Sequence, residues 1–143
     1  MGFWSFLTGS GKDVGVEADK AEESADKIKA EIASLGLEAD GVEIAVEGDT
    51  VKLSGAAVSQ EVKEKIILAA GNIEGIAGVE ESVAAPDEKE PVFHTVEKGD
   101  TLWAISSKHL GNGAHYEKNF EANKPMLSHP DKIYPGQVLR IPA

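Results

Sequence analysis

The sequence contains no cysteine among its 143 residues, which excludes a disulfide framework and a thiolate metal site. Basic residues are also scarce: 14 Lys and Arg stand against 25 Asp and Glu, for a formal net charge of −11. Nucleic-acid binding depends on neutralising phosphates with Lys and Arg, so this balance argues against a nucleic-acid partner. It disfavours binding to anionic membrane surfaces for the same reason.

Long apolar runs are missing as well, because no stretch reaches the roughly 20 apolar residues that cross a bilayer. The apolar start at 3–7 has no positive residue before it and ends at Thr8-Gly9, which is too short for the core of a signal peptide. We therefore expect a cytoplasmic, bacterial-type protein without a membrane span. We expect the apolar start to form a short helix that packs on the first domain.

A linker divides the chain. Residues 84–91 read Ala-Ala-Pro-Asp-Glu-Lys-Glu-Pro, in which two prolines bracket four charged residues. This composition predicts a first domain at 1–83, a linker at 84–91 and a second domain at 92–143. Both domains have small cores, and each is expected to depend on contact with the other for stability.

The first domain has the pattern of an α-β-β-α-β unit. Apolar residues recur at steps of three and four from Ala21 to Leu35, which predicts a helix. Alternating residues at 42–53, interrupted by Glu47-Gly48-Asp49, predict a β-hairpin. Ser59 is placed to cap a second helix that ends at Gly71, and a third strand is expected at 79–83.

The second domain has the pattern β-α-α-β. A strand is expected at 93–96, and Asp100 is placed to cap a helix that carries Leu102 and Ile105. A second helix is expected at 116–122 and a closing strand at 138–141. The whole chain is therefore expected to have an α+β fold.

Both halves resemble known modules. Residues 94–105, 121–125 and 133–142 resemble the beginning, middle and end of a LysM domain. Val51-Lys52-Leu53-Ser54-Gly55 and Gly71-Asn72-Ile73-Glu74-Gly75-Ile76 resemble a BON domain. The BON-then-LysM order over the full length resembles the family of bacterial cytoplasmic potassium-binding proteins.

That resemblance implies a monomeric K⁺ sensor that becomes more compact on binding the ion, with Rb⁺ and Cs⁺ accepted as well. Backbone carbonyls suit this large, weakly hydrated ion, and glycines let a turn aim several of them at one point. The expected metal ligands are the carbonyls of Leu7, Ser10, Gly71, Ile73 and Ile76. Without the resemblance, residues 71–78 are an ordinary helix-to-strand turn.

Two other functions stay open. LysM domains usually bind glycans that contain N-acetylglucosamine, such as peptidoglycan, in a groove that corresponds here to 99–102 and 126–133. Trp103 is expected to serve packing rather than as a sugar platform. Alternatively, the protein is a scaffold that binds an unidentified protein partner through an acidic face.

No pattern points to an enzyme. The four histidines, expected at the surface or half-buried, have no metal-ligand spacing, and no nucleophile elbow or phosphate loop is present.

Overall fold

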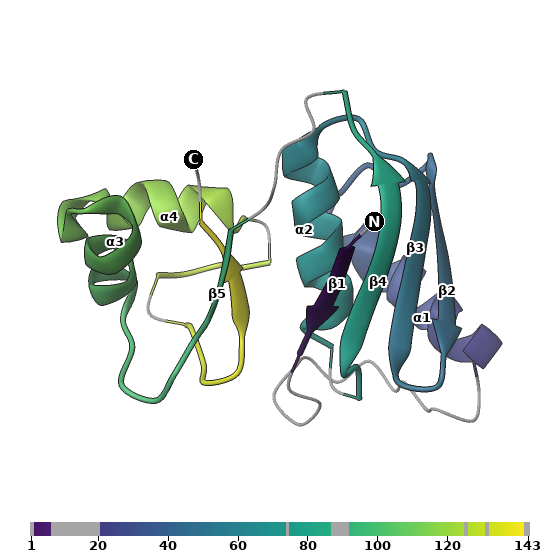
Figure 1. Cartoon of the computed structure of the whole chain (residues 1–143), viewed down its shortest axis with the longest axis horizontal. Coiled ribbons are helices and arrows are strands. Elements are labelled where there is room, and N and C mark those ends of the chain that lie inside the picture. The colour runs from purple at the N-terminus through teal and green to yellow at the C-terminus, as the bar shows by residue number, and fades with distance from the viewer. Residues whose placement is uncertain are drawn as a thin grey trace.

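The structure is a computed structural model that describes residues 2–6, 21–73, 75–86, 92–124, 126–130 and 132–141. Figure 1 shows two α+β units side by side. The N-terminal unit contains β1 (Gly2–Ser5), α1 (Ala21–Ser34), β2 (Val42–Glu47), β3 (Thr50–Ala56), α2 (Gln60–Gly71) and β4 (Gly78–Ala84). The C-terminal unit contains β5 (Phe93–Thr95), α3 (Leu102–Leu110), the 3-10 turn η1 (Gly113–His115), α4 (Tyr116–Ala122) and β6 (Val138–Arg140). The α+β class expected from the sequence is confirmed.

The N-terminal unit is a four-stranded sheet in the order β1-β4-β3-β2. β3 and β4 are parallel, while the other two neighbouring pairs are antiparallel. A parallel pair needs a crossover connection, and α2 provides it. Alternate residues of β2 are buried, as expected for a sheet with one covered face, and α1 and α2 pack on that face (Figure 1).

The apolar start of the chain is a strand, so the predicted short helix was wrong. β1 pairs antiparallel with β4, from Gly2 opposite Glu81 to Ser5 opposite Gly78. The segment does pack on the unit as expected, because Phe6, the next residue, is only 7% exposed. Pairing with the open edge of β4 is a long-range interaction, and a five-residue local pattern carries no sign of it.

The local signals in the middle of this unit are confirmed. The Ser59 hydroxyl accepts a hydrogen bond from the Val62 N–H at 3.1 Å and caps α2. Gly48 takes a positive φ of 62° in the hairpin turn between β2 and β3. The capping hydroxyl satisfies one of the donors that a helix start leaves free, and it fixes where α2 begins.

A buried ion pair ties α2 to β4. The ammonium of Lys63 lies 3.3 Å from Oε2 of Glu81, and each side chain is only 6% exposed. The same carboxylate oxygen accepts a hydrogen bond from the Val83 N–H at 2.9 Å. Such a pair depends on both partners, because either charge alone in this place lacks water to solvate it.

The C-terminal unit packs α3 and α4 against the antiparallel pair β5–β6. Thr101 caps α3 by accepting from the Ala104 N–H at 3.1 Å, so the prediction that Asp100 is the cap was wrong. The Asp100 carboxylate accepts from the Glu97 N–H instead, at 2.9 Å. The core of the C-terminal unit consists of Val96, Leu102, Ile105, Leu127, Leu139 and Ile141.

The two units meet where α2 packs on β6. Val138 of β6 is 5% exposed and belongs to the apolar core of the N-terminal unit. Beside this contact, the Trp4 and Phe93 rings meet edge to face with centroids 4.8 Å apart. Within the described ranges, no helix combines the length and apolar character needed to cross a membrane.

Candidate ion site and the contact between the units

The turn after α2 brings the end of a helix and a glycine bend together. The Asn72 N–H makes the last helical hydrogen bond, to the Leu68 carbonyl at 2.9 Å. The Gly71 carbonyl therefore belongs to the final turn, whose oxygens have no partner within the helix. Gly75 has a φ of 97° and bends the chain. The end of α2 and the bend at Gly75 therefore form a short turn between α2 and β4.

Two buried side chains anchor this turn. Ile73 is 1% and Ile76 0% exposed, so both point into the core of the N-terminal unit. The Ile73 carbonyl accepts a hydrogen bond from the Ile76 N–H at 3.1 Å, which uses one of its two lone pairs. No basic residue lies in the last turn of α2. The helix end therefore offers a cation its negative dipole end without a competing positive charge in that turn.

The N-terminal strand ends against the same turn. The Phe6 ring covers Gly71 so closely that a β-carbon at position 71 would collide with it. The Phe6 N–H donates to the Ala77 carbonyl at 2.8 Å, which fixes where the chain leaves β1. The sequence analysis attributed Gly71 to the bending of the backbone. Its φ is not positive, and the close contact with the Phe6 ring explains why glycine is needed there.

Three of the five expected carbonyl ligands belong to this turn: those of Gly71, Ile73 and Ile76. Leu7 and Ser10 lie outside the described residues, although Leu7 directly follows Phe6. Neutral carbonyl oxygens are the donor type that suits K⁺, so the donor set fits the ion in kind. Three carbonyls would not complete a K⁺ coordination shell, so a K⁺ site at this turn would need further oxygens from another segment.

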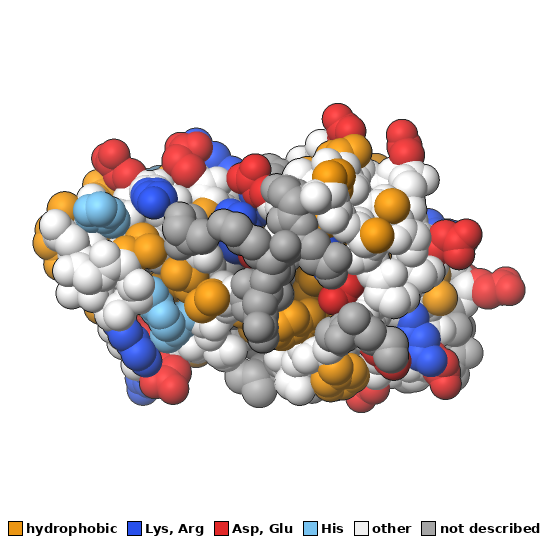
Figure 2. Space-filling model, turned by 45° about the horizontal axis from the view of Figure 1, so that its top comes forward, with side chains coloured by type: hydrophobic (Ala, Val, Ile, Leu, Met, Phe, Trp, Pro, Cys, Tyr) orange, Lys and Arg blue, Asp and Glu red, His pale blue; other side chains and the backbone are white. Residues whose placement is uncertain are grey.

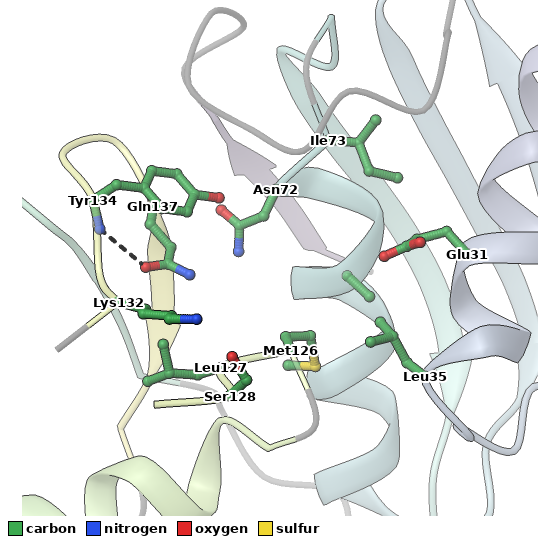
Figure 3. Close-up of a pocket in the computed structure, with 11 residues that line it drawn as sticks. Glu31, Leu35, Asn72, Ile73, Met126, Leu127, Ser128, Lys132, Tyr134 and Gln137 are labelled. Atoms are coloured by element: carbon green, nitrogen blue, oxygen red, sulfur yellow. Dashed lines mark hydrogen bonds between the residues drawn. The ribbon is translucent and has the colours of Figure 1, made fainter. Parts of the chain in front are cut away.

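An asparagine in the turn contacts the other unit, which the sequence analysis missed. The Asn72 side-chain N–H donates to the Val138 carbonyl at 2.8 Å, and its side-chain oxygen accepts from the Val138 N–H at 2.9 Å. In Figure 3 this side chain points from the end of α2 toward the C-terminal unit. Because the two residues are 66 positions apart, no local pattern could have indicated the contact.

A second polar contact joins the units near the middle of α2. Nε of Arg140 donates to Oε1 of Glu64 at 3.0 Å, and the two side chains are 14% and 6% exposed. The other oxygen of Glu64 accepts from the Gln60 side-chain amide at 2.9 Å. The carboxylate is therefore bonded from both units, which compensates for its burial.

A cavity of about 270 Å³ opens beside Asn72, between the two units. Figure 3 shows Glu31 and Leu35 on one side, facing Lys132, Tyr134 and Gln137 on the other. Burial raises the pKa of the Tyr134 phenol, so this phenol stays uncharged near neutral pH. Residues of both units line the cavity.

A separate groove of about 390 Å³ lies on the C-terminal unit, lined by Thr101, Leu102, Trp103, Tyr116, His129 and Pro130. It lies where the sequence analysis expected the LysM groove. Trp103 is 57% exposed, so the expectation that it serves core packing was wrong. Its indole lies against Gly113, and its ring centroid is 6.2 Å from that of Tyr116.

Two histidines form a chain that the sequence spacing did not reveal. His94 Nε2 lies 3.0 Å from Asp100 Oδ2, and His94 Nδ1 lies 3.0 Å from His109 Nε2. The hydrogen bond from the Glu97 N–H has the largest effect in lowering the pKa of the Asp100 carboxyl, and the hydrogen bond with His94 lowers it further. Burial has the largest effect in lowering the pKa of His109, and the nearby charges of His94 and Lys108 lower it further. Figure 2 shows histidines at the surface of this unit, and the described residues contain no group of three or more His, Asp or Glu arranged to hold a metal ion.

Comparison with known protein families agrees with the two-unit layout. The BON domain family matches residues 20–85, and the LysM domain family matches residues 94–142. The chain is 44% identical to the potassium binding protein Kbp of Escherichia coli O6:H1, over 99% of both chains.

Two uncharacterized relatives are less similar. One from Deinococcus radiodurans is 33% identical over 71% of this chain and 44% of its own length. The uncharacterized protein YqbP of Bacillus subtilis is 35% identical over 40% of this chain and 30% of its own length.

Proposed function

This chain belongs to the family of the potassium binding protein Kbp, and we propose that it binds K⁺ and senses its concentration. The ion is held by the backbone carbonyls of Gly71, Ile73 and Ile76, completed by those of Leu7 and Ser10. Binding draws the two units together. In this proposal the protein acts as a monomer in the cytoplasm and has no enzymatic activity.

The observation that carries this proposal is the position of Phe6 on Gly71. The chain leaves the buried Phe6 ring directly beside the helix end and enters the segment that contains the other two proposed ligands. Phe6 and the turn after α2, which are far apart in the sequence, are therefore in contact. In this proposal the residues after Phe6 add the carbonyls that one turn does not provide and that K⁺ coordination requires.

The chemistry of the site favours a large monovalent cation. The proposed ligands are neutral carbonyl oxygens. Those of Ile73 and Ile76 belong to residues whose side chains are buried in the core, so these oxygens resist moving closer together. A smaller ion such as Na⁺ would need the carbonyls to move inward. Rb⁺ and Cs⁺ are close enough to K⁺ in character to bind as well.

Sensing follows from differential affinity. An ion that binds the closed arrangement better than the open one shifts the population toward the closed arrangement, and by no other means. At an ion concentration 100 times the Kd, a state that alone binds the ion gains about 2.7 kcal/mol. This gain is large enough to convert a mainly open population into a mainly closed one.

The test is titration calorimetry of ion-depleted protein in Tris buffer, with KCl injected and NaCl as the matched control. Small-angle scattering on the same samples measures the radius of gyration. Saturable heat with K⁺ alone, together with a smaller radius, supports the proposal. Flat traces for both salts would overturn it, and equal affinities for the two ions would overturn the selectivity.

The groove beside Trp103 favours a second candidate function, the binding of peptidoglycan or another glycan with N-acetylglucosamine. An exposed indole over a hollow is a suitable surface for a sugar ring. Pull-down with peptidoglycan tests it, and Trp103→Ala should abolish retention. Retention that Trp103→Ala does not change would contradict this function for the groove.

A further inference from the structure

The outer edge of β6 is closed by two asparagine side chains. Two backbone hydrogen bonds flank the β5–β6 pair. The Val96 N–H donates to the Gln137 carbonyl, and the Ile141 N–H donates to the Val92 carbonyl. In an antiparallel pair the residues between such positions turn their N–H and C=O groups outward. Val138 and Arg140 are therefore the two residues of β6 that present both groups to its free edge.

Each of these two residues is bound by one carboxamide in the same way. Asn123 donates to the Arg140 carbonyl at 2.9 Å and accepts from the Arg140 N–H at 2.6 Å. Asn72 makes the equivalent pair of bonds with Val138 at 2.8 and 2.9 Å. Each carboxamide thus replaces one residue of a missing neighbouring strand.

The two asparagines differ in where they come from. Asn123 follows α4 and belongs to the same unit as β6, so its bonds do not depend on the arrangement of the units. Asn72 belongs to the other unit and lies between Gly71 and Ile73, two of the proposed ion ligands. The direction of the Asn72 side chain is set by the same backbone that would hold the ion.

We propose that the Asn72 carboxamide couples ion binding to the closing of the two units. The proposal rests on the K⁺ site proposed above. An ion held by the carbonyls of Gly71 and Ile73 fixes the peptide plane that precedes the Asn72 Cα and the plane that follows the Ile73 Cα. With the backbone held on both sides of Asn72, the direction of its Cβ is restricted and both ends of the amide align with Val138.

The geometry makes the coupling sharp. A carboxamide forms two bonds to one residue only when its position and rotation are both correct, whereas a single long charged side chain tolerates displacement. Val138 is 5% exposed, so its N–H and C=O groups have little access to water in the closed state. We expect loss of both bonds to lower the closing equilibrium constant about tenfold to a hundredfold, since each 1.4 kcal/mol is tenfold.

The ion pair between Glu64 and Arg140 provides a matched control. It also joins α2 to β6, but it lies two helical turns before the ion turn. Weakening it should make closing less favourable to the same extent with and without K⁺. Removing the Asn72 amide should reduce closing mainly when K⁺ is present.

The experiment measures the closing equilibrium of the full chain by fluorescence energy transfer. Because the chain has no cysteine, a Glu43→Cys, Lys118→Cys background labels one exposed position on each unit and nothing else. The measured quantity is the ratio of the closing constant in KCl to that in choline chloride. It is compared for the labelled parent, Asn72→Ala, Asn72→Asp and Glu64→Gln, with K⁺ calorimetry on each protein.

We expect the ratio to fall at least tenfold in Asn72→Ala and in Asn72→Asp, whose second oxygen faces the Val138 carbonyl. In Glu64→Gln the ratio should stay within twofold of the parent. K⁺ should still bind to Asn72→Ala, weakened by no more than the lost ratio, because coupling is reciprocal.

An unchanged ratio in Asn72→Ala would overturn the coupling role and leave the K⁺ site standing. A K⁺ affinity that falls further than the ratio would also overturn it, since Asn72 would then be part of the site itself. No K⁺ heat in the parent would overturn the proposed function and the coupling together.

Discussion

The ring of Phe6 occupies the space that a β-carbon on Gly71 would need. Phe6 is 7% exposed and its N–H is bonded to the Ala77 carbonyl, so the ring has no room to withdraw. We expect Gly71→Ala to displace the N-terminal strand, lower stability by about 1–3 kcal/mol and weaken K⁺ binding. Urea denaturation and K⁺ calorimetry measure the two effects.

The control for this prediction is the double variant Phe6→Ala, Gly71→Ala. Removing the ring leaves space for the new methyl group, so the penalty of Gly71→Ala should be much smaller in the Phe6→Ala background. Equal penalties in both backgrounds would show that the glycine is required for another reason.

Trp4 should report on the contact between the units. Its indole packs edge to face on Phe93, and the only other tryptophan is Trp103. In a Trp103→Phe variant the emission therefore comes from Trp4 alone. We expect removal of K⁺ to shift this emission to longer wavelength as the ring gains contact with water. The shift should disappear at saturating K⁺, and an emission maximum insensitive to K⁺ would argue against opening at this point.

The buried pair of Lys63 and Glu81 predicts a stability effect that is independent of the ion site. Lys63→Met leaves the Glu81 carboxylate 6% exposed without its cation, which should lower the free energy of unfolding by about 3–5 kcal/mol. The urea midpoint should fall with little change in slope. Lys63→Met combined with Glu81→Met should recover most of the loss, and a single variant as stable as the parent would contradict the assignment.

The histidine chain predicts a pH dependence. Burial lowers the pKa of His109 in the folded protein, whereas the unfolded chain titrates near its ordinary value of about 6.5. Below about pH 6.5 the unfolded state binds the proton more readily, so stability is lost as the pH falls toward the folded pKa. It does not change through this group at higher pH. Thermal melts of His109→Gln should therefore show a smaller loss between neutral and acidic pH, while the exposed His115→Gln should behave like the parent.

The sequence predicted the elements whose determinants are local. Ser59 capped α2 as expected, because a serine three residues before an N–H donor is a local signal. Thr101 and Asp100 were exchanged as the cap of α3, since either side chain can accept from a helix start and only the surroundings decide. Asp100 is engaged by the Glu97 N–H and by His94.

The candidate site was only partly predictable, for a physical reason. Every residue has a carbonyl, so Gly71, Ile73 and Ile76 carry no side-chain mark of a ligand, and they were expected only because of a family resemblance. The β1 strand, the Phe6 contact and the Asn72 bonds all depend on partners far away in the sequence. These long-range contacts determine the surroundings of the turn after α2, and local periodicity does not encode them.

The two carboxamides on β6 also have a consequence for association. An open strand edge is a template on which the backbone of a second chain can pair. Asn72 blocks that edge in this structure. If the units separate without the ion, as we propose, the Val138 groups and the apolar surface around them would be uncovered. Storage without potassium should therefore favour oligomers built by strand addition, and the ion would then act as a guard against aggregation as well as a signal.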